Sequence, residues 1–523
     1  MASENQIVFH RAAQTQANPL NLGGRALFII PDNFQDDNVF PLGPGYLAAV
    51  LRNAGVQVET YCMDVFHYTN DELSTFLRNN SYDLVCIGFM GPRFKRGIEA
   101  LCLATRQAMN PDAWFVIGGY GPSSTPEFML ERTTADIVAI GEGEETLLEI
   151  MMAKRGQGIT LAEIQSIAYR NNGTITTNPR RKTIKYLNEL PMPAWDLFPM
   201  DNYTDCLLFA GMKKPRDKAF PLTSTRGCTD KCSFCFRLDS GIRLRSAEHV
   251  VAEMKVLNER YGVNYFYFVD ELAIVSRKQI FQLLALIRES LPPIKFRMDC
   301  RVTLFDDEIA VALKAAGCVF LNIGFETSSQ LVLYQMNKRA TIEQNVAAAE
   351  TARRYGIGIG INMIWGMPGD SLETMRQDAA FIKRFNQYDQ IRTLRPVTPY
   401  PGSPLFELAV SQGLLTGPDD FFNRFKNSDL YMVNFVGLPE NEIYESLFEL
   451  NRDLILDHFA HTSKDMEAAE ALIQSFYDLY FKGVTTFRGP PRLNNKHCRA
   501  DSATTQGVWE NMPLAEGTRL SGM

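Results

Sequence analysis

Three cysteines within eight residues form the densest group of metal-binding side chains in this sequence. Cys228, Cys232 and Cys235 are spaced Cys-x3-Cys-x2-Cys and follow the segment AFPLTST, whose apolar residues are typical of a strand. Closely spaced thiolates are soft ligands that favour an iron–sulfur cluster or zinc. Three thiolates on a four-iron cluster leave one iron open to an outside ligand, which is what a catalytic cluster requires.

A structural zinc site and an electron-transfer cluster are the alternatives, and each needs a fourth protein ligand. The nearest histidine, His249, opens an expected helix, and no second Cys-x-x-Cys pair lies close by. The spacing favours a catalytic cluster, and the non-enzymatic iron–sulfur or zinc protein stays open as an alternative. The other seven cysteines stand singly, several of them in apolar runs where a thiol packs as a small core residue: Cys62, Cys86, Cys102, Cys206, Cys300, Cys318 and Cys498.

Composition excludes several other classes of protein. The chain has 523 residues, 46% of them hydrophobic, and a formal net charge of -7. This length predicts two or three domains, and the slightly acidic balance makes nucleic acid an unlikely partner. The sequence shows neither a secretory signal nor an apolar run of about 18 residues, so we expect a cytoplasmic protein without a transmembrane segment.

Residues 23–155, after a flexible arm at 1–22, alternate apolar strand segments with helical segments. This alternation predicts a doubly wound parallel sheet covered by helices on both faces. Such sheets bind ligands at the carboxyl ends of their strands. Several glycines lie at or just past these ends, where they either let backbone approach a bulky ligand or simply make tight turns: Gly88, Gly91, Gly118, Gly119, Gly121, Gly141 and Gly143.

A second alternating series follows a proline-rich linker at 156–215, which also contains a small hairpin turning at 171–173. Residues 216–410 contain six strand–helix units, with strands predicted at AFPLTST, NYFYFVD, IKFRMDC, CVFLNIGFE, GIGINMIWG and QIRTLRPVT. Six such units close into a partial or full barrel or lie as an open sheet, and the sequence leaves this choice open. Residues 411–487 are expected to be helical, and 488–523 a disordered tail.

The cysteine segment, preceded by Arg226 and Gly227, resembles the hallmark loop of the radical S-adenosylmethionine superfamily. Further phrases at 269–271, 324–329, 361–370 and 398–409 are similar to those of its barrel. PLGPGYLAAVLRNAG, FVIGGYGPSSTPE and DIVAIGEGEET resemble the subfamily with an N-terminal cobalamin-binding-like domain. The resemblance implies an α/β protein: a doubly wound parallel-sheet domain, a (β/α)6 partial TIM-type barrel and a C-terminal helical region.

The resemblance also implies roles for individual residues. The three cysteines would hold a [4Fe-4S] cluster. S-adenosylmethionine would lie against Phe234, Asp270, Glu271, Arg301, Glu326, Gly366 and Pro368. Cobalamin would lie against Pro41, Leu42, Gly43, Gly118, Gly119, Gly141, Glu142 and Gly143. The loop at 31–45 contains no histidine to serve as a lower axial ligand. In the C-terminal region Phe421, Phe422, Tyr431, His458 and His461 are as consistent with packing as with a substrate pocket.

The activity implied by the resemblance is methylation of an unactivated carbon or phosphorus centre of a small molecule, through a 5′-deoxyadenosyl radical and methylcobalamin. A cyclase, or an enzyme of rearrangement, dehydration or oxidation using the same radical, is the alternative. The family also implies an electron donor such as flavodoxin or ferredoxin. A transfer-RNA methylthiotransferase is disfavoured because the first domain lacks three additional clustered cysteines.

Overall fold

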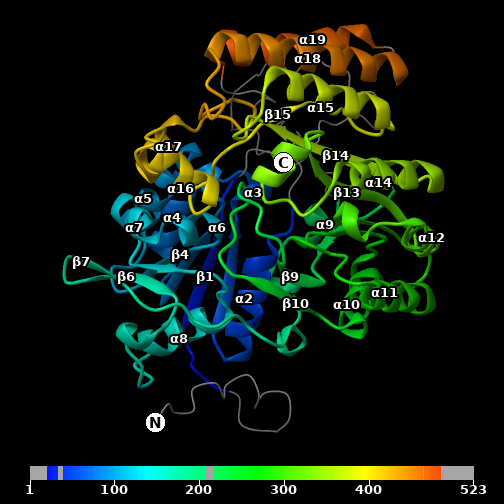
Figure 1. Cartoon of the computed structure of the whole chain (residues 1–523). Helices are drawn as coiled ribbons and strands as arrows, with labels where there is room; N and C mark the ends of the chain where they lie inside the picture. Colours follow the sequence, from blue (N-terminus) through cyan, green and yellow to red (C-terminus); the bar gives the residue numbers. More distant parts are fainter. Residues whose placement is uncertain (1–19, 33–38, 206–215, 463–464, 485–523) are drawn as a thin grey trace.

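The computed structural model describes residues 20–32, 39–205, 216–462 and 465–484. They form two large β-sheets surrounded by helices and one two-stranded hairpin, followed by a mostly helical C-terminal region (Figure 1). This confirms the predicted fold class. The expected arm at 1–19 and the expected tail at 488–523 lie outside the described residues.

The first sheet has the strand order β2-β1-β3-β4-β5-β6-β7. Its parallel strands are β1 (Arg25–Ile30), β2 (Gln57–Cys62), β3 (Leu84–Gly88), β4 (Trp114–Gly118) and β5 (Ile137–Ala139). Its helices are α2 (Leu42–Asn53), α3 (Met63–Phe66), α4 (Asn70–Asn79), α5 (Ile98–Ala108), α6 (Tyr120–Ser124), α7 (Pro126–Arg132) and α8 (Glu144–Lys154), with a 3-10 turn η1 (Gly91–Arg96).

Alternate residues of β1 explain why this sheet is covered on both faces. Ala26, Phe28 and Ile30 are buried together with α2 and α8, whereas Leu27 and Ile29 are buried in a second cluster with α4 and α5. Successive side chains of a strand point to opposite faces, so a fully apolar strand needs helices on both sides.

The expected hairpin extends this sheet. β6 (Ile167–Asn171) pairs antiparallel with β5 and with β7 (Thr174–Thr177). Its turn residues Asn172 and Gly173 both have positive φ, 48° and 85°, which matches the right-handed strand twist of two-residue hairpins. The linker also contains η2 (Leu161–Glu163) before the hairpin, and η3 (Leu187–Glu189), η4 (Trp195–Leu197) and α9 (Met200–Thr204) after it.

The second sheet is parallel throughout and has the order β15-β14-β13-β12-β11-β8. Its strands are β8 (Ala219–Leu222), β11 (Tyr265–Phe268), β12 (Lys295–Cys300), β13 (Cys318–Glu326), β14 (Gly358–Trp365) and β15 (Arg395–Pro396). Its helices and turns are α10 (Ala247–Tyr261), α11 (Arg277–Ser290), η5 (Val302–Leu304), α12 (Asp307–Ala315), α13 (Gln330–Gln335), α14 (Ile342–Tyr355) and α15 (Leu372–Phe385). Within the described ranges β8 and β15 each pair on one side only, so the sheet is an open half-barrel.

Two features of this half differ from the sequence prediction. A short hairpin, β9 (Thr225–Cys228) and β10 (Gly241–Leu244), stands where only a loop was expected. The last strand, expected over the segment QIRTLRPVT, has only two residues in the structure. The backbone of Leu394 forms hydrogen bonds with the side chain of Asn451 instead of with a neighbouring strand.

The C-terminal helices contact both halves of the molecule (Figure 1). α16 (Pro404–Ser411) and α17 (Pro418–Arg424) place Phe421 and Phe422 in the apolar cluster of the first sheet. α18 (Glu440–His461) packs on α15 and pairs with α19 (Met466–Phe481). Among the helices of the described residues, none has the length and apolar character to cross a membrane.

Replacing Asn451 by alanine is expected to destabilise the fold around β15. Asn451 is fully buried and bonds the amide and carbonyl of Leu394 at 2.8 and 3.1 Å and the hydroxyl of Tyr480 at 3.2 Å. Its removal leaves buried polar groups unpaired, which costs about 2–3 kcal/mol. Urea unfolding measures this loss; Asn423→Ala, at an exposed position of α17, is the control, and equal midpoints for the two variants would contradict the prediction.

Candidate active site

The hairpin β9–β10 determines where the cysteine segment begins. Cys228 ends β9 and pairs with Gly241 of β10. Gly227 has a φ of 89°, and a Cβ atom on it would collide with the carbonyl oxygen of Gly241. The position before Cys228 therefore requires glycine.

The loop that carries the other two thiols is fastened to the barrel by its backbone. The amide of Ser233 donates to the carbonyl of Met336 at 2.8 Å, and the carbonyl of Ser233 accepts from Leu405 at 2.8 Å. Asn337 donates to the carbonyl of Lys231 at 2.8 Å. Phe234 packs on the main apolar cluster. These contacts hold Cys232 and Cys235 at the mouth of the half-barrel, beyond the carboxyl ends of its strands.

The three thiols are free, and Cys232 is the most buried of them. Burial raises the pKa of Cys232 to about 11, against an opposing effect of Lys338, and burial likewise raises the pKa of Cys235 to about 11. Sulfur that is neutral without a metal becomes a thiolate when it coordinates one. Among the described residues no three His, Cys, Asp or Glu side chains converge on a single-ion position, whereas a cluster binds each thiolate at a different iron.

Glu326 ends β13 beside this loop and forms a buried ion pair. Its carboxylate lies 2.6 Å from the ammonium of Lys338, and both side chains are about nine-tenths buried. Glu326 also has a φ of 67°, an unusual backbone conformation for a residue with a side chain. The pair lies directly over Gly324, where a Cβ atom would collide with the Glu326 carboxylate. The sequence singled out Glu326 but not its partner, twelve residues later.

Asp270, which was expected at the mouth of the half-barrel, holds the neighbouring backbone in place through hydrogen bonds. It is 3% exposed and accepts from the amides of Ser224 and Thr225 at 2.8 and 3.0 Å and from the Ser224 hydroxyl at 2.5 Å. Burial raises the pKa of Asp270 to about 6 against these three bonds. Asp270 thus fixes the turn from β8 into the cysteine hairpin.

Glu271 and Arg301 contact neighbouring segments instead of standing free. Glu271 accepts a hydrogen bond of 2.9 Å from Tyr120, which belongs to α6 of the first domain. Arg301 forms an ion pair with Asp230 of the cysteine loop. Arg301 therefore helps to hold the cysteine loop, and Glu271 links the two domains.

The turn after β14 is a tight cap built around Gly366, which has a φ of 99°. The amides of Gly366 and Met367 both donate to Asp370 at 2.9 Å. Tyr431 donates to the carbonyl of Gly366 at 3.0 Å, and a Cβ atom on Gly366 would collide with its ring. Pro368 lies within this turn, so Gly366 and Pro368 are held by Asp370 and Tyr431, neither of which the sequence identified for this role.

The residues expected to hold cobalamin lie together at the carboxyl edge of the first sheet. Pro41 caps α2, which Leu42 and Gly43 begin; Gly118 ends β4 and Gly119 follows it; Gly141, Glu142 and Gly143 lie between β5 and α8. Gly119 has a φ of 93°, and its Cβ would lie 3.0 Å from the carbonyl oxygen of Phe89. This edge is where open α/β sheets bind their ligands.

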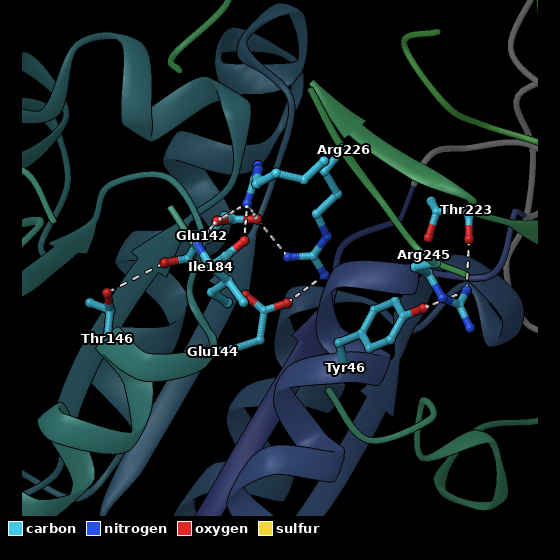
Figure 2. Close-up of polar contacts among 9 residues, drawn as sticks. Tyr46, Glu142, Glu144, Thr146, Ile184, Thr223, Arg226 and Arg245 are labelled. Carbon is cyan, nitrogen blue, oxygen red and sulfur yellow. Dashed lines mark hydrogen bonds and ion pairs between the residues drawn. The ribbon is translucent and has the colours of Figure 1, made fainter. Parts of the chain in front are cut away.

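Arg226 links this edge to the cysteine hairpin (Figure 2). Its guanidinium reaches between two carboxylates of the first domain, Glu142 at 2.8 Å and Glu144 at 2.6 Å. Arg243 of β10 pairs with Glu142 at 2.7 Å, and Arg226 lies 5.4 Å from the ring centre of Tyr46 on α2. Burial alone would raise the pKa of Glu142, but Arg226 and Arg243 hold it below its usual value. Both carboxylate oxygens of Glu142 are therefore engaged by arginines.

A histidine outside the expected loop also lies at this edge. The Nδ1 atom of His67, just after α3, lies 3.0 Å from a carboxylate oxygen of Asp32, just after β1. Both side chains are largely buried. The part of the preceding loop at 33–38 lies outside the described residues.

Two family models match the two halves of this arrangement. The model for the radical SAM superfamily matches residues 222–382, and the model for a B12 binding domain matches residues 36–151. An uncharacterized methyltransferase of Pyrococcus horikoshii is 31% identical over 72% of this chain and 79% of its own length. An anaerobic magnesium-protoporphyrin IX monomethyl ester cyclase of Rubrivivax gelatinosus is 27% identical over 73% and 69%.

A solved structure shares the fold along most of the chain. The radical S-adenosylmethionine methyltransferase TsrM of Kitasatospora setae, solved with cobalamin and a [4Fe-4S] cluster, superposes with a TM-score of 0.66 at 17% identity, covering 87% of this chain and 95% of that one.

A three-thiol loop at the mouth of a parallel half-barrel, joined to a cobalamin-type domain, defines a class of cluster-dependent radical enzymes. The chain belongs to the radical SAM superfamily and carries a B12 binding domain. Its cofactors are a [4Fe-4S] cluster, S-adenosylmethionine and cobalamin.

Proposed function

We propose that this protein transfers a methyl group to an unactivated carbon or phosphorus centre of a small molecule. The observation that supports this most directly is the ion-pair bridge from Arg226 to Glu142 and Glu144. It brings the cysteine hairpin and the glycine edge of the first sheet together. A methyl carrier and a radical source must share one substrate, so the two sites have to face each other.

In this proposal Cys228, Cys232 and Cys235 would hold the cluster, which would be left open to S-adenosylmethionine. The residues present fit such a group, because the three thiols are free and belong to one fastened segment. Glu326 with Lys338, and the turn at Gly366 to Pro368, would lie beside S-adenosylmethionine, together with Phe234, Glu271 and Arg301. Asp270 acts through the backbone that it positions.

The glycine edge would hold cobalamin, with Gly118, Gly119, Gly141 and Gly143 at the strand ends and Pro41, Leu42 and Gly43 at the start of α2. When bound, the cofactors supply a 5′-deoxyadenosyl radical and a transferable methyl group. The buried pair of Glu326 and Lys338 keeps a fixed charge arrangement at the mouth. An electron donor of flavodoxin or ferredoxin type would reduce the cluster.

The second candidate is a cyclase or another radical enzyme without methyl transfer. The cyclase of Rubrivivax gelatinosus is 27% identical over 73% of the chain, against 31% over 72% for the Pyrococcus horikoshii methyltransferase. The residues described above serve a radical source in either case, so the fate of the methyl group decides between the two functions.

Isotope labelling tests the proposal. Anaerobically purified holoenzyme, with reductant and trideuteromethyl S-adenosylmethionine, is incubated with a low-molecular-weight extract of the source cells, and products are read by mass spectrometry. We expect a metabolite that gains the trideuteromethyl group together with 5′-deoxyadenosine. A variant with all three cysteines replaced by alanine is the control. Formation of 5′-deoxyadenosine with an altered but unlabelled metabolite would overturn methyl transfer and favour the second candidate.

A further inference from the structure

The inner face of the half-barrel carries several polar side chains beside aromatic ones, whereas its outer face is apolar. In β12 and β13 the residues Phe296, Met298, Leu321 and Ile323 belong to the main apolar cluster beneath the helices. The residues between them point to the opposite face, because side chains alternate along a strand. That inner face carries Arg297, Asp299, Asn322 and Asn362, with Gly358 and Gly360 on β14.

A second arginine joins this face from the segment before β15. The guanidinium of Arg392 lies 5.9 Å from the ring centre of Phe320, and that of Arg297 lies 5.8 Å from the same ring. A Cβ atom on Gly360 would lie 3.2 Å from Arg392 and 2.5 Å from the side-chain oxygen of Asn322. Glycine at this position therefore leaves the space in which these polar groups approach each other.

The three arginines in this region differ in whether a carboxylate neutralises their charge. Arg297 pairs with Asp299 at 3.0 Å, and Arg395 pairs with Asp429 at 3.1 Å. Arg392, about nine-tenths buried, makes no ion pair within the described part of the chain, and it donates only to the neutral side chain of Gln390, at 2.6 Å.

The surroundings of Arg392 disfavour its positive charge. Burial, and then the charges of Arg297 and Arg395, lower the pKa of Arg392 to about 10, and Asp389 opposes this only from a distance. Arg392 also acts electrostatically on His458 of α18, and burial lowers the pKa of that histidine to about 4. A buried guanidinium without a contacting anion raises the free energy of the folded protein, so binding an anion beside it would be favourable.

We infer that the inner face of the half-barrel binds an oxyanion of the substrate, a carboxylate or a phosphate, through Arg392, with the amide of Asn362, which donates to the side-chain oxygen of Asn322 at 2.8 Å, lying on the same face. The side chain of Asp299 is 32% exposed, so solvent reaches this face. The inference rests on the proposed function, because it assigns the substrate of that same site to a chemical class.

The register places this anion well below the cysteine loop. Arg392 lies level with Gly360, six residues before Gly366 at the mouth. Six residues of a strand span roughly 20 Å. The substrate would therefore extend along the barrel, with its reacting atom near the mouth and its anionic group deep inside.

Anion binding to the reconstituted holoenzyme tests this directly. Thermal unfolding is followed with increasing inorganic phosphate or succinate, at ionic strength kept constant with chloride. We expect one of the two probes to raise the unfolding temperature saturably, by roughly 2 °C. Phosphate alone would identify a phosphate group, and succinate alone a carboxylate. No saturable rise with either probe would overturn the inference.

Substitutions test whether Arg392 is responsible for this rise in unfolding temperature. Arg392→Gln is expected to abolish the rise, while Arg384→Gln, at an exposed arginine of α15, keeps it. If the glutamine variant does not fold, Arg392→Lys carries the test: lysine keeps the charge but loses the two-pronged donor geometry, so apparent affinity falls about tenfold. Unchanged affinity in either variant would refute the site. The assay uses neither turnover nor a methyl group, so its failure and that of the labelling experiment are distinguishable.

Discussion

Replacing Cys232 by alanine is expected to abolish cluster assembly and, with it, cleavage of S-adenosylmethionine. Two thiolates cannot replace three at a site whose fourth iron must stay open to the cosubstrate. We expect the iron and sulfide content of the reconstituted protein to fall, and 5′-deoxyadenosine formation to drop at least about a hundredfold. Metal analysis and chromatography of the reaction measure both quantities.

Cys86→Ala is the matched control, because Cys86 in β3 is as buried as Cys232, at 6% against 7% exposure. Removing either sulfur takes a comparable thiol out of a buried position, so a general loss of stability would affect both variants alike. Iron content that remains normal in Cys232→Ala, or falls equally in Cys86→Ala, would contradict the assignment of Cys232 as a cluster ligand.

Replacing Arg226 by glutamine is expected to loosen the two domains from each other. Its guanidinium is 21% exposed and lies between Glu142 and Glu144, which are 14% and 5% exposed. Without Arg226, Glu144 loses its ion pair and Glu142 keeps only the one with Arg243. Because both carboxylates are poorly hydrated, we expect the free energy of unfolding to fall by about 3 kcal/mol. Urea unfolding measures the loss, and the ratio of bound corrinoid to iron reports whether the domains still hold both cofactors.

Arg277→Gln is the control, because Arg277 also bridges two carboxylates, Asp306 and Glu308, but at an exposed position. Such a surface pair contributes about 1 kcal/mol or less. An equal loss in both variants would contradict a special role for the buried bridge.

The bridge also predicts a pH dependence. The folded pKa of Glu142 is lowered, so its contribution is present above the unfolded value of about 4.3 and is lost as pH falls through the folded value. The difference in unfolding free energy between wild type and Arg226→Gln should therefore shrink below about pH 4. A difference that stays constant through this range would argue against ionised Glu142 as the partner.

Much of the fold could be predicted because it depends on local periodicity. Apolar residues at strand and helix spacing identified both parallel sheets, and the helix predicted at residues 247–261 agrees with α10 (Ala247–Tyr261). The hairpin β9–β10 was missed because its strands have only four residues each and contain few apolar side chains. The expected strand at QIRTLRPVT was too long because a distant side chain, Asn451, takes its backbone bonds.

The amino-acid sequence by itself determined the chemistry that this protein can support, because three thiols at fixed spacing remain neighbours in any fold. It also determined the class of fold, because periodicity is a property of neighbouring residues. Only the tertiary structure decided that Arg226 meets Glu142 and Glu144, 84 and 82 residues away, that Lys338 neutralises Glu326, and that Arg392 enters the barrel. Such pairings depend on how whole strands and helices pack, and no local pattern encodes them.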